Sequence, residues 1–254
     1  MYYETSSASD YRRRANVVCS RQSGKLAIVY LIYFVILVVV GFIDNETAYT
    51  EVLADGTVET TAWFNSVFSF ITAGAFSLSL VQIHKKASQN EVVQVEDLLV
   101  GFNDWRRSIT LNVLISLYTT LWTLLFIIPG IVKTFSYSMS YYIANDNPNL
   151  SAKECIDRSR KMMDGHKFDY FCLMLSYFGL IILSCFTLGI ALLWVLPKMQ
   201  QASYQFYLDI SGNNYNYDSY EKEEESYYSD YKAQSYADEY EVDDEEEYAT
   251  KNPW

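Results

Sequence analysis

The sequence contains none of the short motifs that mark the common enzyme classes. It has no Walker loop for phosphate, no G-x-S-x-G nucleophile elbow and no H-E-x-x-H metal motif. Its two histidines, His84 and His166, lie far apart in the chain, and because each is next to a lysine we expect both to be solvated. The sequence therefore predicts no catalytic residues and no bound cofactor or metal, and we expect a protein that is not an enzyme.

The four cysteines do not form a pattern that would hold a disulfide framework or a zinc ion. Cys19 and Cys155 lie in basic segments, whereas Cys172 and Cys185 lie in an apolar run. None of them has C-x-x-C spacing, which structural zinc sites and redox motifs use.

Charged residues are scarce over six stretches, although they make up 20% of the whole sequence. About 20 apolar residues in a helix cross the roughly 30 Å hydrocarbon core of a bilayer. Within lipid every backbone polar group needs an internal partner, so such segments fold as helices. We predict an all-α fold with six membrane-spanning helices over residues 25–43, 62–83, 108–128, 131–145, 168–186 and 188–208.

The segment between the first two predicted spans, residues 44–61, has no Lys or Arg. Basic clusters instead precede the first span and follow the second and the fourth. Because cytoplasmic loops carry an excess of Lys and Arg, six spans with both termini in the cytoplasm put all these clusters on one side. Five spans would divide them between the two sides. The predicted architecture is thus a polytopic bundle of three helical hairpins, preceded by a basic cytoplasmic segment, residues 1–24.

Pro129 and Gly130 fall between the third and fourth predicted spans. Since Pro ends a helix and Gly permits unusual backbone angles, we predict a tight turn here at the outer face. Lys133 would then reach the outer headgroups, with a pore or substrate role as the alternative. Ser136 and Ser140, followed four residues later by an alanine, have the spacing of a close helix-packing face, and a transport lining is the alternative.

Residues 149–167, NLSAKECIDRSRKMMDGHK, predict an amphipathic helix. Ser151 and Glu154 have the spacing of a capping box, and Gly165 is a typical helix stop. Apolar or small residues follow the 3.6-residue period of a helix, namely Ala152, Cys155, Ile156, Ser159, Met162 and Met163. We expect this helix to lie in the inner membrane interface with its basic face toward anionic headgroups.

Residues 92–107 and 12–26 contain weaker examples of the same pattern, and Trp105 before two arginines resembles an interfacial anchor. Three such helices, each before a hairpin, would make three parallel repeats. The residues expected to contact lipid headgroups are Arg106, Arg107, Lys153, Arg158, Arg160, Lys161 and Lys167.

The sixth predicted span becomes polar halfway along its length. Lys198 falls close to mid-membrane, and Gln201 and Gln205 share its helix face. An ionisable residue in a membrane often marks a functional site. No Asp or Glu lies within this span to pair with Lys198, however, and Pro197 would kink the helix. The Lys198 ammonium either reaches toward the inner leaflet or lines a polar cavity.

The C-terminal 44 residues, 211–254, differ in composition from the rest. They hold 14 acidic residues against three lysines, a net charge of −11, whereas residues 1–210 have a net charge of −1. An acidic segment with few aliphatic residues cannot bury enough apolar surface to fold. We predict a disordered, Tyr-rich cytoplasmic tail, either as a solvated appendage or as a docking strip for a basic protein partner.

The segments IIPGIVKTF and NLSAKECIDRSRKMMDGHK, with the later FYLDI, resemble a family of bacterial integral membrane proteins called domain of unknown function 975. The likeness covers about residues 13–210. It implies a location in the bacterial cell (inner) membrane and a distant similarity to the membrane domain of glycerophosphodiester phosphodiesterases, whose catalytic barrel is absent here. Lys198 and Leu180 depart from the family pattern. The family has no established activity, so the resemblance implies no catalytic residues.

Two classes of function follow. The first is a non-enzymatic membrane scaffold or accessory protein that organises lipids or partners. The second is a small permease that uses the polar faces of the fourth and sixth spans. The basic interfacial surface favours the first class. The sequence excludes neither class and gives no oligomeric state, and nothing in it suggests binding to nucleic acid.

Overall fold

The computed structural model describes residues 6–47, 49–52, 58–61, 63–187 and 189–212, with Ser229 and Lys232; from residue 40 to 68, and at Cys185, only the backbone is described. The chain divides into two units, Met1–Asn213 and Asn214–Trp254. The predicted disordered tail therefore lies almost wholly outside the described residues.

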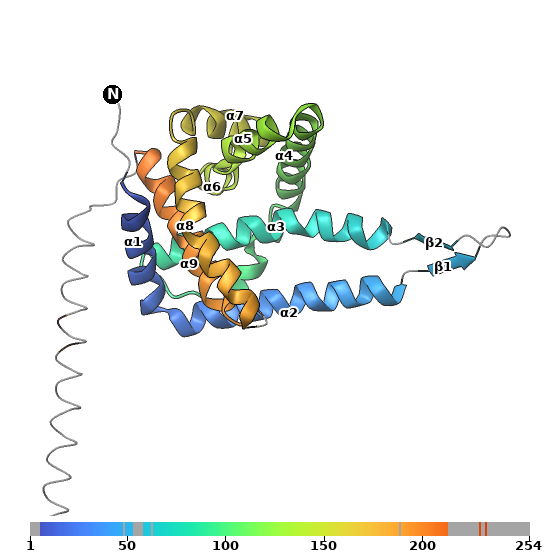
Figure 1. The fold of residues 1–254 in the computed structure, drawn as a ribbon, viewed down its shortest axis with the longest axis horizontal. Coiled ribbons are helices and arrows are strands. Elements are labelled where there is room, and N and C mark those ends of the chain that lie inside the picture. Colours follow the sequence, from blue (N-terminus) through green and yellow to red (C-terminus); the bar gives the residue numbers. More distant parts are fainter. Residues whose placement is uncertain are drawn as a thin grey trace, which may run out of the picture. The chain divides into compact units, whose positions relative to one another are not determined.

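The described part of the unit Met1–Asn213 is mostly helical, as the all-α prediction requires (Figure 1). In chain order its elements are α1 (Ala8–Arg21), α2 (Ser23–Thr47), β1 (Tyr49–Val52), β2 (Val58–Thr61), α3 (Trp63–Ser88), the 3₁₀ helix η1 (Val95–Phe102), α4 (Trp105–Leu125), α5 (Ile127–Tyr137), α6 (Ser140–Asp146), α7 (Ala152–Met162), α8 (Lys167–Phe186) and α9 (Leu192–Ile210).

A short β-hairpin joins α2 and α3, where the sequence indicated only a connection without Lys or Arg. β1 and β2 pair antiparallel, with Tyr49 opposite Thr61 and Val52 opposite Val58. Val and Thr are β-branched residues that favour strands, so the two strands agree with local propensity. The all-α prediction did not include this hairpin.

The core is formed where α1, α3, α6, α7, α8 and α9 meet. Tyr11 of α1 packs edge-on against Phe206 of α9, with ring centroids 5.3 Å apart, and both side chains are buried. Ile143, Ile156 and Leu173 bring α6, α7 and α8 into the same cluster. The N-terminal segment is therefore part of the folded unit, because its α1 helix covers α8 and α9.

The prediction of one helix over residues 131–145 is wrong. The chain forms α5 and α6 instead, with a break at Ser138 and Met139. Ser159 of α7 supplies the hydrogen bonds that the break leaves open, because its Oγ donates to the Ser136 carbonyl at 2.8 Å and accepts from the Met139 amide at 3.2 Å. At 1.5 Å per residue, the 11-residue α5 is about 16 Å long, too short to cross a membrane.

Pro129 and Gly130 are not the turn that the sequence predicted. The chain reverses at Phe126, whose backbone is extended, and Pro129 then lies in the first turn of α5, where a missing amide hydrogen costs no helix bond. Gly130 permits a close approach of two helices: a Cβ on it would lie 2.7 Å from Thr123 Cα of α4.

Some helices are long and apolar enough to cross a membrane. Among the described residues these are α4 and Lys167–Ser184 of α8, and the bent pair of α1 and Ser23–Val39, which turns by 92°, would add a third. Large apolar side chains are exposed on these helices, including Phe34, Leu124 and Phe178. An exposed apolar surface of this kind suits contact with lipid, so the chain has the features of a membrane protein.

The six-span bundle of three hairpins is not confirmed. In Figure 1, α2 and α3 run across the view whereas α4 and α8 run up it, so these helices do not share one axis direction. The hairpins are also unequal: α2 and α3 have 25 and 26 residues, whereas α4 and α5 have 21 and 11. This inequality argues against three equivalent repeats.

Candidate functional site

The capping box of α7 is present as the sequence predicted. The Ser151 hydroxyl accepts from the Glu154 amide, and the Glu154 carboxylate accepts from the Ser151 amide at 2.8 Å. Hydrogen bonds from the Ser151 side chain and backbone lower the pKa of Glu154. These hydrogen bonds therefore define Ser151 as the N-cap residue of α7.

The apolar stripe of α7 packs on protein and not, as predicted, in the membrane interface. Cys155, Ile156 and Ser159 are fully buried, because α4, α5 and α6 cover this face. The opposite face is exposed and carries Lys153, Arg158, Arg160 and Lys161. Protein contacts on the buried face thus hold the helix that carries this basic surface.

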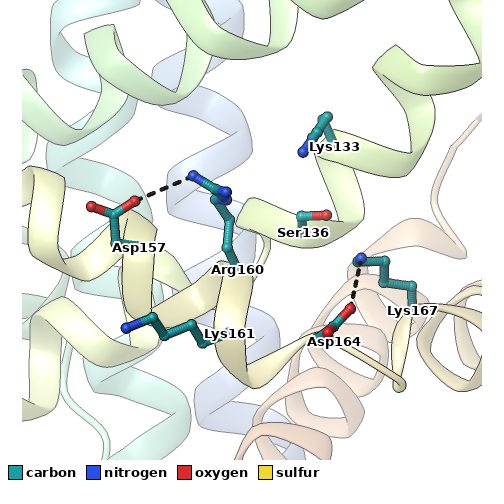
Figure 2. Close-up of a pocket in the computed structure, with 7 residues that line it drawn as sticks. All are labelled: Lys133, Ser136, Asp157, Arg160, Lys161, Asp164 and Lys167. Carbon is teal, nitrogen blue, oxygen red and sulfur yellow. Dashed lines mark hydrogen bonds and ion pairs between the residues drawn. The ribbon is translucent and has the colours of Figure 1, made fainter.

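A cleft of about 540 Å³ opens between α5, α7 and the start of α8 (Figure 2). It is lined by four cations and two carboxylates, a formal net charge of +2, together with one hydroxyl: Lys133, Ser136, Asp157, Arg160, Lys161, Asp164 and Lys167. In Figure 2 the cationic groups of Lys133, Arg160 and Lys167 face the same space, whereas the Lys161 ammonium points away from it.

The two carboxylates of the cleft are in long contacts with two of the cations. Arg160 Nη1 lies 3.4 Å from Asp157 and Lys167 Nζ lies 3.5 Å from Asp164. Exposed pairs of this kind contribute little to stability, typically about 0–1 kcal/mol. Lys133 lies 4.6 Å above the ring centroid of Trp122, and no ion pair holds its ammonium within the part of the chain that the structure describes.

The position of Lys133 corrects the sequence interpretation. We expected it at the outer face, opposite the basic residues of α7, but the structure brings it into one cleft with them. The reason is that α5 packs against both α7 and α8, so that Lys133 lies in the same cleft as Arg160 and Lys167.

The polar residues of α9 belong to a buried hydrogen-bonded network. Gln201 Oε1 accepts from His84 Nδ1 at 2.8 Å, and its amide donates to Ser88 Oγ at 2.5 Å. Gln205 donates to the same hydroxyl at 3.0 Å, and Tyr30 bonds His84 Nε2 at 2.8 Å. All five side chains are buried. Gln201 and Gln205, two of the three residues that were candidates to line a polar cavity, therefore join α9 to α3 and, through His84, to α2.

His84 was predicted to be solvated, and this is wrong, because its side chain is 1% exposed. Since a Gln oxygen only accepts, Nδ1 carries the proton of the neutral ring and Nε2 accepts from Tyr30. Burial lowers the pKa of His84 to about 4, although the hydrogen bond to Gln201 acts in the opposite direction.

The other predicted positions are divided between surface and interior. Arg106 is exposed and stacks over Trp105 at 5.5 Å, whereas Arg107 donates to the Asn147 carbonyl and so joins α4 to the segment before α7. Lys198 is half-buried. Ser136 and Ser140 are buried, and within the described residues the Ser140 hydroxyl has no hydrogen-bond partner.

Sequence reasoning missed the buried network, yet the sequence holds a signal for it. His84 and Ser88 are four residues apart, as are Gln201 and Gln205, so each pair occupies one helix face. The two faces carry complementary hydrogen-bond donors and acceptors, so a contact between these two helices could have been predicted. Among the described residues, no group of three or more His, Cys, Asp or Glu could hold a metal ion.

Comparison with known protein families gives a match to part of the chain. Residues 127–214 match the family described as "Protein of unknown function (DUF975)". No curated protein and no solved structure matches the chain. The matched segment contains α5 to α9 and therefore the whole lining of the cleft. The similarity to glycerophosphodiester phosphodiesterases stays a prediction.

Proposed function

We propose that this chain, whose residues 127–214 belong to the DUF975 family, is a non-enzymatic accessory or scaffold protein of the membrane. It would gather anionic lipids, or partners that carry anionic groups, at the basic surface of α7. It would lie in the bacterial cell membrane with both termini in the cytoplasm, and the acidic tail would bind a basic protein.

The observation that carries this proposal is the packing of α7. Its apolar stripe is buried against α4, α5 and α6, so the helix backbone that carries its four exposed cations is held in one position. Polybasic surfaces attract anionic leaflets by about 1 kcal/mol for each Lys or Arg near the surface. A surface that is already ordered needs no folding on the membrane before it binds.

Lipid enrichment tests the proposal. The protein is placed in nanodiscs of mixed phosphatidylcholine and phosphatidylglycerol, and native mass spectrometry counts the lipids that it retains. Wild type should retain phosphatidylglycerol in excess of its share in the nanodisc, and the variant with Lys153→Gln and Arg158→Gln should lose most of that excess. Both residues are exposed on α7 and lie outside the cleft. Equal lipid composition in both proteins would refute the proposal.

A small permease is the second candidate, and two observations favour it. Lys198 is half-buried within α9, and Ser140 carries a buried hydroxyl without a partner in the described part of the chain. Lys198→Leu separates the two functions. An accessory protein should keep its melting temperature and its lipid enrichment, whereas a permease that uses Lys198 should lose a small molecule that wild type retains in native mass spectra.

A further inference from the structure

We propose that the cleft between α5, α7 and α8 is a binding site for a phosphate group, held by Lys133, Arg160 and Lys167. This inference deepens the proposed function, since it gives the chemistry of one ligand at the basic surface. The phosphate belongs either to a lipid headgroup or to a soluble phosphate ester, and the experiment below distinguishes these two sources.

The arrangement of charge is the first support. Three cations from separate elements face one space: Lys133 from α5, Arg160 from α7 and Lys167 from the start of α8 (Figure 2). Like charges that share a cleft repel one another, so an anion between them stabilises all three. The volume of about 540 Å³ lies within the range of small-ligand sites.

The absence of strong internal partners is the second support. The Arg160 and Lys167 contacts with Asp157 and Asp164 are long, and the Asp164 side chain is 82% exposed. These carboxylates can turn toward solvent at little cost, because exposed ion pairs are weak. Lys133 contacts the Trp122 ring, and within the described residues no carboxylate competes for its ammonium.

The chemistry of the donors selects phosphate over a carboxylate. A phosphate monoester carries about −1.5 to −2 charges and three acceptor oxygens, which matches three cationic donors and a formal net charge of +2. Arg160 can offer two parallel N–H groups, as guanidinium groups do to phosphate, and the lysines bind as point charges. Ser136 lines the cleft but offers the ligand no hydrogen-bond donor, because its hydroxyl donates to the Val132 carbonyl at 2.9 Å.

The test uses the full chain in nanodiscs and has two arms. In the first, nanodiscs of phosphatidylcholine alone are titrated with inorganic phosphate and with glycerol 3-phosphate in a calorimeter. In the second, a minor share of phosphatidic acid is added to the phosphatidylcholine, and native mass spectrometry counts the phosphatidic acid retained. Lys133→Gln removes one donor, and Lys25→Gln is the matched control, because Lys25 is exposed at the start of α2, outside both the cleft and the basic surface of α7.

We expect Lys133→Gln to weaken binding about tenfold or more, as the loss of a charged hydrogen bond does, and Lys25→Gln to leave it unchanged. Lys133→Arg should restore binding, and Arg160→Gln should weaken it as Lys133→Gln does, so that a folding defect in one variant does not decide the result. Binding in the first arm identifies a soluble phosphate ester, and binding in the second arm alone identifies a headgroup.

The inference is overturned if neither arm shows binding, or if Lys25→Gln weakens it as much as Lys133→Gln. The first arm contains no anionic lipid, and the lipid-enrichment test changes residues outside the cleft. Each hypothesis can therefore fail while the other stands.

Discussion

The network around His84 and the cleft around Lys133 both consist of polar side chains from three packed segments. The two sets of side chains differ in how fully their hydrogen bonds and ion pairs are formed. In the network every amide, hydroxyl and imidazole group described above meets a partner at 2.5 to 3.0 Å. In the cleft the ion pairs are 3.4 and 3.5 Å long, and three cations face open space. The difference separates polar groups that hold helices together from polar groups that are available to a ligand.

The comparison also shows how a polar residue in an apolar helix is to be interpreted. Gln201 and Gln205 stood out in the sequence as intramembrane positions, and such residues often mark a functional site. Here their neighbours complete their hydrogen bonds, and a satisfied buried network gives a core a unique arrangement. From the sequence, Lys133 was expected to reach the outer headgroups, with a pore or substrate role as the alternative. In the structure it lines the cleft.

The largest effect is expected from Gln201→Leu, which breaks the network at its centre. The change leaves the buried His84 Nδ1 without its acceptor and removes one of the two amides that donate to Ser88 Oγ, and a buried polar group without a partner costs about 1–3 kcal/mol. The free energy of unfolding should fall by about 3 kcal/mol, measured as a lower melting temperature in nanodiscs. Gln200→Leu is the control, because this half-buried side chain contacts Tyr142 at 3.5 Å. Equal effects of both changes would mean that the network does not stabilise the fold.

The pH dependence of stability should distinguish the two histidines. Because the pKa of folded His84 is about 4 and the ordinary value is 6.5, the unfolded chain takes up a proton between these values that the folded chain does not. His84 should therefore lower the free energy of unfolding as pH falls from 6.5 to 4, by about 3 kcal/mol in total. Unfolding measured across this range should lose that slope in His84→Gln and keep it in His166→Gln. A wild-type slope unchanged by His84→Gln would contradict the buried, neutral imidazole.

A methyl group at position 130 should disturb the packing of α5, the helix that carries Lys133, against α4. In Gly130→Ala the new Cβ would lie 2.7 Å from Thr123 Cα, and overpacking of this kind costs about 1–3 kcal/mol. The melting temperature should fall. Gly179→Ala is the matched control: it has open space around its Cβ position and gains helix propensity of up to about 1 kcal/mol. If Gly130→Ala is as stable as Gly179→Ala, α5 does not approach α4 as closely as described.

The smallest effect is expected at the start of α7. Ser151→Ala removes the helix cap, which typically costs about 1 kcal/mol. Hydrogen exchange should become faster at the first turn of α7, where the cleft residues are not located, while Ser151→Asp, which keeps an acceptor, should stay close to wild type. Unchanged exchange in Ser151→Ala would show that tertiary packing alone fixes the helix end.

Much of the local structure could be predicted from the sequence. The helix at residues 168–186 agrees with α8 to within one residue, and the Ser151–Glu154 box marks the start of α7. Both features depend on residues close together in the chain. The buried stripe of α7 was also visible as a pattern, but a pattern does not say whether lipid or protein covers an apolar face.

The candidate site could not be predicted because it depends on contacts between distant segments. No local residue demands the break after α5, and Ser159, which satisfies it, lies 20 residues beyond Met139. Lys133 and Arg160 lie on different helices, and only the packing of α5 against α7 brings them into one cleft. The same holds for His84 and Gln201, which are 117 residues apart.

The Ser159 hydroxyl restricts which residues this position can tolerate. It must donate to one backbone group and accept from another within a site that is fully buried. Alanine can do neither, and asparagine would need more room. Threonine has the same hydroxyl but would bring an extra methyl group into a packed interior. Among related chains that keep the break, position 159 is therefore expected to vary less than the exposed basic residues on either side of it.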